Sequence, residues 1–139
     1  MRLNQAIPPF NNAKLRQAIL HLVDQEQTLR AYVDDASLYT NCPSFYMCNS
    51  PYFTDAGWPK PDAAKAKQLV KESGYDGSPI VLLDATEIAL HPQTLVVAQA
   101  MRDIGLNVYY QAMDWPTLST RRASSPGRAG SGCSSLPLR

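Results

Sequence analysis

The chain has 139 residues, a formal net charge of +1 at pH 7 and a hydrophobic content of 45%. This length fits one domain with a core large enough to fold without disulfides or metals, and the composition is that of a globular protein. The small net charge excludes a basic surface for nucleic acid or anionic membrane, and no apolar run reaches the roughly 20 residues of a membrane helix.

The N-terminal part predicts a short strand followed by two helices. The segment 2–7 (RLNQAI) has strand length, and the two prolines after it end any strand ladder. Asn12 predicts a helix N-cap. Asp24 begins a second helix and has Gln27 as its capping-box partner. The first helix is expected to bury apolar residues at helical spacing, namely Leu15, Ala18, Ile19, Leu22 and Val23.

A long segment without periodicity follows, over residues 34–61. Proline and glycine interrupt it repeatedly, which predicts an ordered loop, and long loops inside compact domains are usually functional. Within it Cys42 and Cys48 flank Phe45 and Tyr46. From the residues alone, the cysteines could form a redox pair, a structural disulfide, a metal site or part of a binding site. A zinc site is the weaker alternative, because a second cysteine pair or a nearby histidine is missing.

The next segment predicts a helix, a buried strand and a second helix. Asp62 caps a helix that ends at Gly74, and 79–84 (PIVLLD) is a continuous apolar run of strand length. A helix from Pro92 then ends at Gly105. Its inward face is expected to carry Leu95, Val97, Ala100, Met101 and Ile104.

The alternating segment 106–113 (LNVYYQAM) predicts another strand, and Asp114 caps a last helix with Pro116 in its first turn. A strand, a helix and a strand at this spacing form a βαβ unit with parallel strands. We therefore expect an α/β fold in which a βαβ unit packs against further helices.

The composition changes at Ser124. The tail 124–139 contains mainly small residues, proline, glycine and arginine without periodicity, and it holds the third cysteine, Cys133. This predicts a disordered terminus or, alternatively, an out-of-frame translation of GC-rich DNA. The expected organisation is therefore one unit over residues 1–123 and a tail over 124–139.

Catalytic and metal motifs are not evident. His21 and His91 lie 70 positions apart and show no spacing shared with cysteines or carboxylates. A Gly-rich phosphate loop, a nucleophile elbow and the HExxH motif are all missing. The sequence therefore predicts a protein that is not an enzyme and that has neither a metal site nor a cofactor.

Three stretches carry a family resemblance: PPFNNAKLRQAILHLVD, YFTDAGWPKPDAAKAKQLVKESGYDG and VVAQAMRDIGLNVYYQAMDWPTLSTRR. In this order and spacing they resemble the bacterial extracellular solute-binding proteins of family 5, the peptide, oligopeptide and nickel receptors of ABC importers. The resemblance covers about residues 2–123. It implies a partial second lobe of a periplasmic-binding-protein-like receptor, whose two lobes close on the ligand like a hinged clamp.

The resemblance implies the solute-binding component of an ABC importer, here as a truncated fragment without full ligand binding. The alternatives are a folded pseudogene product without function and, third, a small thiol-redox protein. The implied partners are a small solute or peptide and an ABC permease, with self-association of the fragment through exposed strand edges. The parent family is periplasmic. The N-terminal segment lacks the apolar stretch of a signal peptide, so cytoplasmic localisation is expected if the chain is made as written.

The resemblance also implies ligand-contacting residues. Trp115 and Arg122 occupy positions near the ligand cleft of the oligopeptide receptors, and an indole and a guanidinium suit a peptide backbone and a carboxylate. The structural alternatives are a core tryptophan at a helix start and a solvated cation at a helix end. Asn4 either contacts ligand or satisfies backbone groups, and the latter is favoured.

The resemblance further implies that the loop of Cys42 and Cys48 lies beside the cleft. In the oxidising periplasm of the parent family a Cys42–Cys48 disulfide is expected. It would hold Phe45 and Tyr46 as a rigid apolar shelf in the ligand wall. The loop is therefore interpreted as a disulfide-closed structure, and Cys133 as an incidental residue of the tail.

Overall fold

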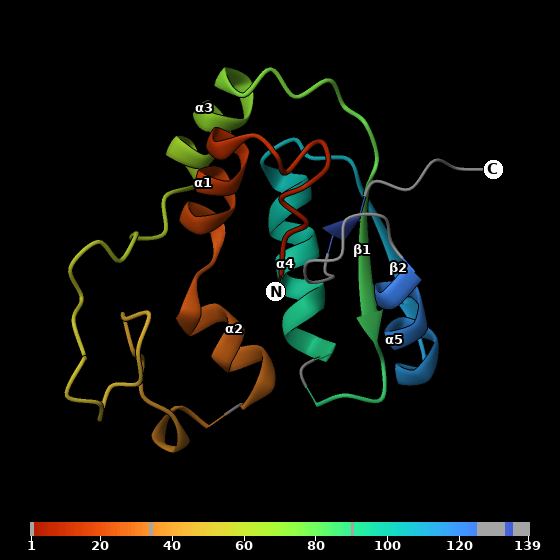
Figure 1. Cartoon of the computed structure of the whole chain (residues 1–139). Coiled ribbons are helices and arrows are strands. Elements are labelled where there is room, and N and C mark those ends of the chain that lie inside the picture. Colours follow the sequence, from red (N-terminus) through yellow and green to blue (C-terminus); the bar gives the residue numbers. More distant parts are fainter. Residues whose placement is uncertain (1, 34, 90, 125–132, 135–139) are drawn as a thin grey trace.

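A computed structural model of the chain describes residues 2–33, 35–89, 91–124 and 133–134 (Figure 1). Helices dominate the first half, and the strands lie in the second. The elements follow in the order α1 (Ala13–Leu22), α2 (Gln25–Tyr32), the 3-10 helix η1 (Ala36–Leu38), α3 (Ala63–Glu72), β1 (Ile80–Ala85), α4 (His91–Asp103), β2 (Val108–Met113), α5 (Trp115–Ser124) and β3 (Cys133–Ser134).

The strands form one sheet in the order β2-β1-β3. β1 and β2 are parallel, with Ile80 opposite Val108 and Ala85 opposite Met113, and α4 connects them. This confirms the predicted βαβ unit and the α/β class. β3 pairs with β1 in the antiparallel direction. Five of the six residues of β1 are buried, as expected for a central strand whose two faces are covered.

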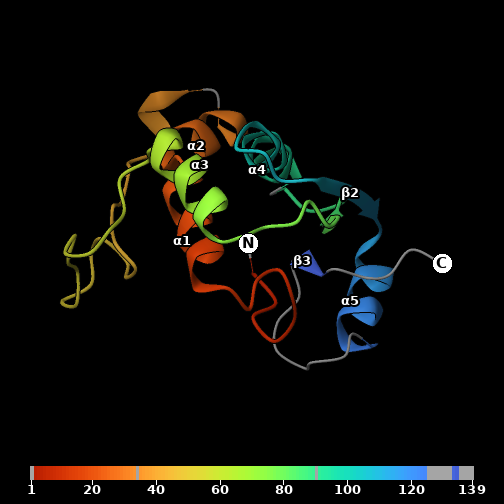
Figure 2. The same ribbon diagram turned by 90° about the horizontal axis from the view of Figure 1, so that it is seen from above.

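The helices lie on two sides of the sheet. Figure 2 shows α1 to α4 on one side of the strands and α5 on the other. α1 packs against α3, and α2 packs along α4. The loop between η1 and α3 projects away from the strands, beyond α1 and α2, in both views. The βαβ unit and this loop therefore occupy opposite ends of the molecule.

The predicted caps begin three helices. The side chain of Asn12 accepts a hydrogen bond from the Lys14 amide at 2.9 Å, and Asp24 accepts one from the Glu26 amide at 2.9 Å. Asp62 does the same for the first turn of α3. These bonds satisfy amides that have no partner inside the helix. Gly105, with φ of 94°, provides the left-handed residue that ends the turn after α4, as the sequence predicted.

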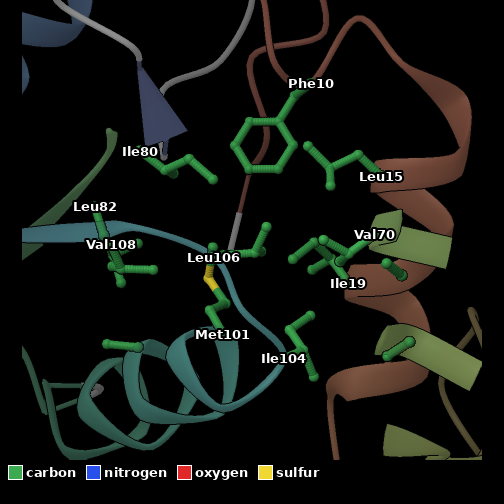
Figure 3. Packing of buried hydrophobic residues seen from close by; sticks show 13 residues of the cluster. Phe10, Leu15, Ile19, Val70, Ile80, Leu82, Met101, Ile104, Leu106 and Val108 are labelled. Carbon is green, nitrogen blue, oxygen red and sulfur yellow. The ribbon is translucent and has the colours of Figure 1, made fainter. Parts of the chain in front are cut away.

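The core lies between the helices α1, α3 and α4 and the face of the sheet that α4 covers (Figure 3). Phe10, Leu15, Ile80 and Met101 are its largest fully buried side chains. Leu15, Ala18 and Ile19 are buried, so the predicted apolar face of α1 is confirmed at these positions. This core fixes α4 against β1 and thereby sets the position of the residues at the start of α4.

Two predictions about the elements were wrong. Residues 2–7 do not form a strand: only Leu3 makes a bridge, and Asn4 accepts a hydrogen bond from the Ala6 amide at 3.1 Å, which turns the chain. Leu95 was expected to face inward but is 46% exposed, whereas Ala98 is buried in its place. α4 carries apolar residues on several faces, so periodicity alone could not identify the buried one.

Most of the predicted tail lies outside the described residues. The exceptions are Ser124, which ends α5, and the two residues of β3. Among the helices that the structure describes, none combines the length and the apolar character that crossing a membrane requires.

Candidate functional site

A cavity of about 340 Å³ opens at the carboxyl end of β1. In α/β folds ligands bind outside the carboxyl ends of the strands, where the loops to the following helices diverge. The volume falls within the range of small-molecule sites. Residues from β1, α4, α5 and the N-terminal segment line the cavity, among them Asp84, His91, Val97, Trp115, Leu118, Arg122 and Arg2.

Trp115 and Arg122 both line this cavity. Trp115 is the first residue of α5 and only Asp114 separates it from β2, so its place is set by the end of that strand. Leu118 lies between them on the helix and is 8% exposed. The spacings of three and four residues put all three side chains on one face of α5. Trp115 itself is 45% exposed, so it is not the core residue of the structural alternative.

A buried carboxylate lies at the edge of the same cavity. Asp84, in β1, is 6% exposed. Its Oδ2 accepts a hydrogen bond from the Tyr110 hydroxyl at 2.6 Å and lies 2.5 Å from Nδ1 of His91. Tyr110 comes from β2, and His91 is the first residue of α4. Each element of the βαβ unit thus contributes one residue to this polar cluster. The two partners of Asp84 offset the cost of burying its carboxylate.

The residue spacing did not reveal the partner of His91. Its partner, Asp84, lies seven residues earlier, at the end of β1, and the turn after the strand brings the two together. A usable signal was present in the sequence. An aspartate at the end of the apolar run PIVLLD is predicted to be buried, and a buried carboxylate requires hydrogen-bond donors nearby.

The cluster shifts the ionisation of Tyr110. The pKa of Tyr110 is raised to about 12, mainly by burial of the phenol. The hydrogen bond to Asp84 and the negative charge of that carboxylate also contribute to this rise. Because the fold favours the protonated phenol, this contribution to stability is complete below the ordinary tyrosine pKa of about 10 and is lost as the pH rises through about 12. Over this pH range we expect the free energy of unfolding, measured in urea, to fall more steeply with pH for the wild-type chain than for Tyr110→Phe. Equal slopes for the two proteins would contradict the assignment.

The disulfide between Cys42 and Cys48 is present. The amide of Cys42 donates a hydrogen bond to Oε1 of Gln25 at 2.7 Å, which fastens the closed loop to the first turn of α2. The thiol-redox alternative would require this bridge to be readily reducible, whereas a structural bridge resists mild reductant.

The aromatic residues of this loop lie on its surface. Phe45 is 62% exposed and Tyr46 57% exposed. Phe45 packs against Trp58 with ring centroids 5.1 Å apart, and Tyr46 packs against Tyr52 at 6.2 Å. Neither Phe45 nor Tyr46 lines the cavity, and the loop projects away from the strands (Figure 1). The structure therefore does not bring these two residues together with Trp115 and Arg122, and their ligand contact stays a prediction.

Asn4 is 5% exposed and does not line the cavity. Its side chain satisfies the Ala6 amide, in line with the structural interpretation of this residue. Within the described ranges, no group of three or more histidine, cysteine, aspartate or glutamate residues could hold a metal ion.

The family model of the bacterial extracellular solute-binding proteins, family 5 middle, matches residues 1–127. The chain belongs to this family. The probable peptide ABC transporter periplasmic-binding protein y4tO of Sinorhizobium fredii is 42% identical over 128 residues, which cover 88% of this chain and 24% of that protein. The dipeptide-binding protein DppE of Bacillus subtilis is 27% identical, covering 82% of this chain and 23% of that protein. The chain thus spans about a quarter of the length of these relatives.

Solved structures agree with this family assignment. The ABC transporter substrate-binding protein CtaP of Listeria monocytogenes has a TM-score of 0.77 at 27% identity, over 94% of this chain and 27% of that chain. NikA of Brucella suis has a TM-score of 0.68 at 20% identity, over 86% of this chain and 27% of that chain, and so supports the fold alone. The predicted family and the partial periplasmic-binding-protein-like fold are confirmed.

Proposed function

We propose that this family 5 chain is part of the solute-binding component of a peptide-type ABC importer, and that it supplies one wall of the ligand cleft. The relatives include peptide- and dipeptide-binding proteins, which supports the solute class. The observation that carries the proposal is the convergence of Trp115 and Arg122 on one cavity at the carboxyl end of β1. Binding rather than catalysis is the proposed activity.

The cavity offers complementary contacts to a peptide. The indole of Trp115 presents a flat apolar face, and Arg122 presents a guanidinium that can pair with a carboxylate through two hydrogen bonds. Arg2 adds a second cation at the rim, and Leu118 and Val97 provide apolar surface. A short peptide with a free C-terminal carboxylate matches this combination. By the same proposal, its partner in the cell is an ABC permease, and it works in the periplasm.

Peptide binding can be followed by the fluorescence of Trp115. The chain has two tryptophans, so Trp58→Phe leaves Trp115 as the reporter. We expect no response to trialanine at micromolar concentration, because one wall supplies only part of the contacts of a closed cleft. We expect a saturable response in the millimolar range, at a dissociation constant of about 1 mM, which corresponds to roughly 4 kcal/mol of binding free energy.

Two variants separate site binding from nonspecific effects. Arg122→Gln removes the proposed carboxylate partner and is expected to weaken the millimolar response about tenfold, a loss of about 1.4 kcal/mol. Lys65→Gln removes an equal charge from an exposed position on α3, away from the cavity, and should leave the response unchanged. A wild-type protein without any saturable response would overturn the proposal and favour a folded product without function.

We also propose that the chain self-associates. Among the described strands, β2 pairs only with β1, so its outer edge presents backbone amides and carbonyls that can pair with a second copy. Tyr109, in the same strand, is 48% exposed. Sedimentation equilibrium at rising protein concentration is expected to show a dimer, and a strict monomer at high concentration would refute this proposal.

A further inference from the structure

His91 is the member of the polar cluster that faces both the buried carboxylate and the cavity. Its Nδ1 lies 2.5 Å from Oδ2 of Asp84, and the side chain is 31% exposed while it lines the cavity. The second ring nitrogen, Nε2, makes no hydrogen bond to any residue that the structure describes. One nitrogen is therefore held by Asp84, whereas Nε2 has no hydrogen-bond partner among the described residues.

The cluster determines which nitrogen carries the proton in the neutral ring. Oδ2 of Asp84 accepts a hydrogen bond from the Tyr110 hydroxyl at 2.6 Å and also contacts Nδ1 of the imidazole. An ionised carboxylate can only accept hydrogen bonds, so both neighbours must donate to it. His91 then donates through Nδ1–H, and in the neutral imidazole Nε2 is left as an acceptor.

We propose that His91 is a further solute-contacting, specificity-determining residue of the cavity, which Asp84 and Tyr110 hold in the tautomer that presents Nε2 as a hydrogen-bond acceptor. This inference rests on the proposed function of the cavity. It names the chemical group that is recognised: an N–H donor of the solute, either a peptide amide or an ammonium group. Arg122 and Arg2 recognise negative charge, so His91 gives the same cavity a contact of the opposite kind.

The role of Asp84 in this arrangement is positional. It touches the histidine from the protein side and orients the ring, as carboxylates do behind histidines that bind metals. Tyr110 orients Asp84 in turn by donating to the same oxygen. Because the three residues come from β1, β2 and α4, the βαβ unit itself fixes the direction of the acceptor.

The tautomer can be measured in the free protein. Long-range proton–nitrogen correlation spectra of 15N-labelled protein distinguish Nδ1–H from Nε2–H when they are recorded on the neutral ring. We expect His91 to be predominantly the Nδ1–H form. In the double variant Asp84→Leu/Tyr110→Phe, which removes acceptor and donor together, we expect the Nε2–H form to predominate. His21, whose Nδ1 lies 3.2 Å from the Lys60 carbonyl, should keep its spectrum in both proteins and serves as the internal control.

The contact with solute is tested by adding trialanine. If Nε2 accepts a hydrogen bond from the peptide, its nitrogen resonance moves with the same saturation curve as the Trp115 fluorescence. An Nε2–H tautomer in the free wild-type protein would overturn the proposed orientation. A response of Trp115 without a shift of the His91 nitrogen would overturn the contact while the proposed function stands. If neither signal responds, the proposed function and the contact both fail. The tautomer of the free wild-type protein still shows whether Asp84 orients the ring. That measurement does not require the double variant to fold.

Discussion

Replacing Phe10 with alanine is expected to lower the free energy of unfolding by about 3–5 kcal/mol. Phe10 is 1% exposed and packs in the cluster that joins α1, α3 and α4 to the sheet (Figure 3). Removing the ring loses its transfer free energy and leaves a cavity that the surrounding side chains fill only in part. Urea unfolding followed by circular dichroism measures the change as a fall in the midpoint at constant slope.

Phe53→Ala provides the matched control. Phe53 is 44% exposed in the loop before α3, so its loss should change the free energy of unfolding by no more than about 0.5 kcal/mol. Similar losses for Phe10→Ala and Phe53→Ala would show that the core is not where the structure places it.

The variant Asp84→Leu is expected to lower the free energy of unfolding by about 1–3 kcal/mol. The leucine side chain suits a site that is 6% exposed, but the Tyr110 hydroxyl, 2.6 Å from the lost carboxylate, is left without its acceptor. The cost of an unsatisfied buried donor exceeds the value of the hydrogen bond itself. The ring of His91 is more exposed and can bind water instead, so the tyrosine is expected to account for most of the loss.

A second substitution tests this explanation. Adding Tyr110→Phe to Asp84→Leu removes the orphaned hydroxyl, and the double variant should recover most of the lost stability, because replacing both partners by apolar groups is nearly neutral. Urea unfolding of the two single variants and the double variant completes the cycle. Additive losses would contradict the coupling between Asp84 and Tyr110.

Local signals in the sequence predicted most of the fold. The caps at Asn12, Asp24 and Asp62 and the stop at Gly105 each rest on a hydrogen bond or a backbone conformation that one residue type supplies, so they could be located without tertiary information. The prediction of an N-terminal strand was wrong because the Asn4 side chain makes a turn that competes with strand pairing. The prediction of the buried face of α4 was partly wrong because several faces of that helix are apolar.

The candidate site was predicted less completely. Trp115 and Arg122 share a face of α5, and the family resemblance identified them together. The cluster of Asp84, His91 and Tyr110 depends on parallel pairing between β1 and β2 and on the turn after β1, which single-residue patterns do not contain. Phe45 and Tyr46 belong to a loop whose direction is set by its anchor on α2, so the sequence could not show that it lies away from the strands.

Solute is proposed to dock in the cavity at the carboxyl end of β1. Amide proton–nitrogen spectra of the 15N-labelled chain, recorded during titration with millimolar trialanine, test it most directly, because every described backbone amide reports separately. We predict that the shifts concentrate at 82–88, at the first turns of α4 and along α5 from Trp115 to Arg122. Shifts centred on 42–53, with the cavity residues unmoved, would contradict the account and place the solute on the disulfide-closed loop.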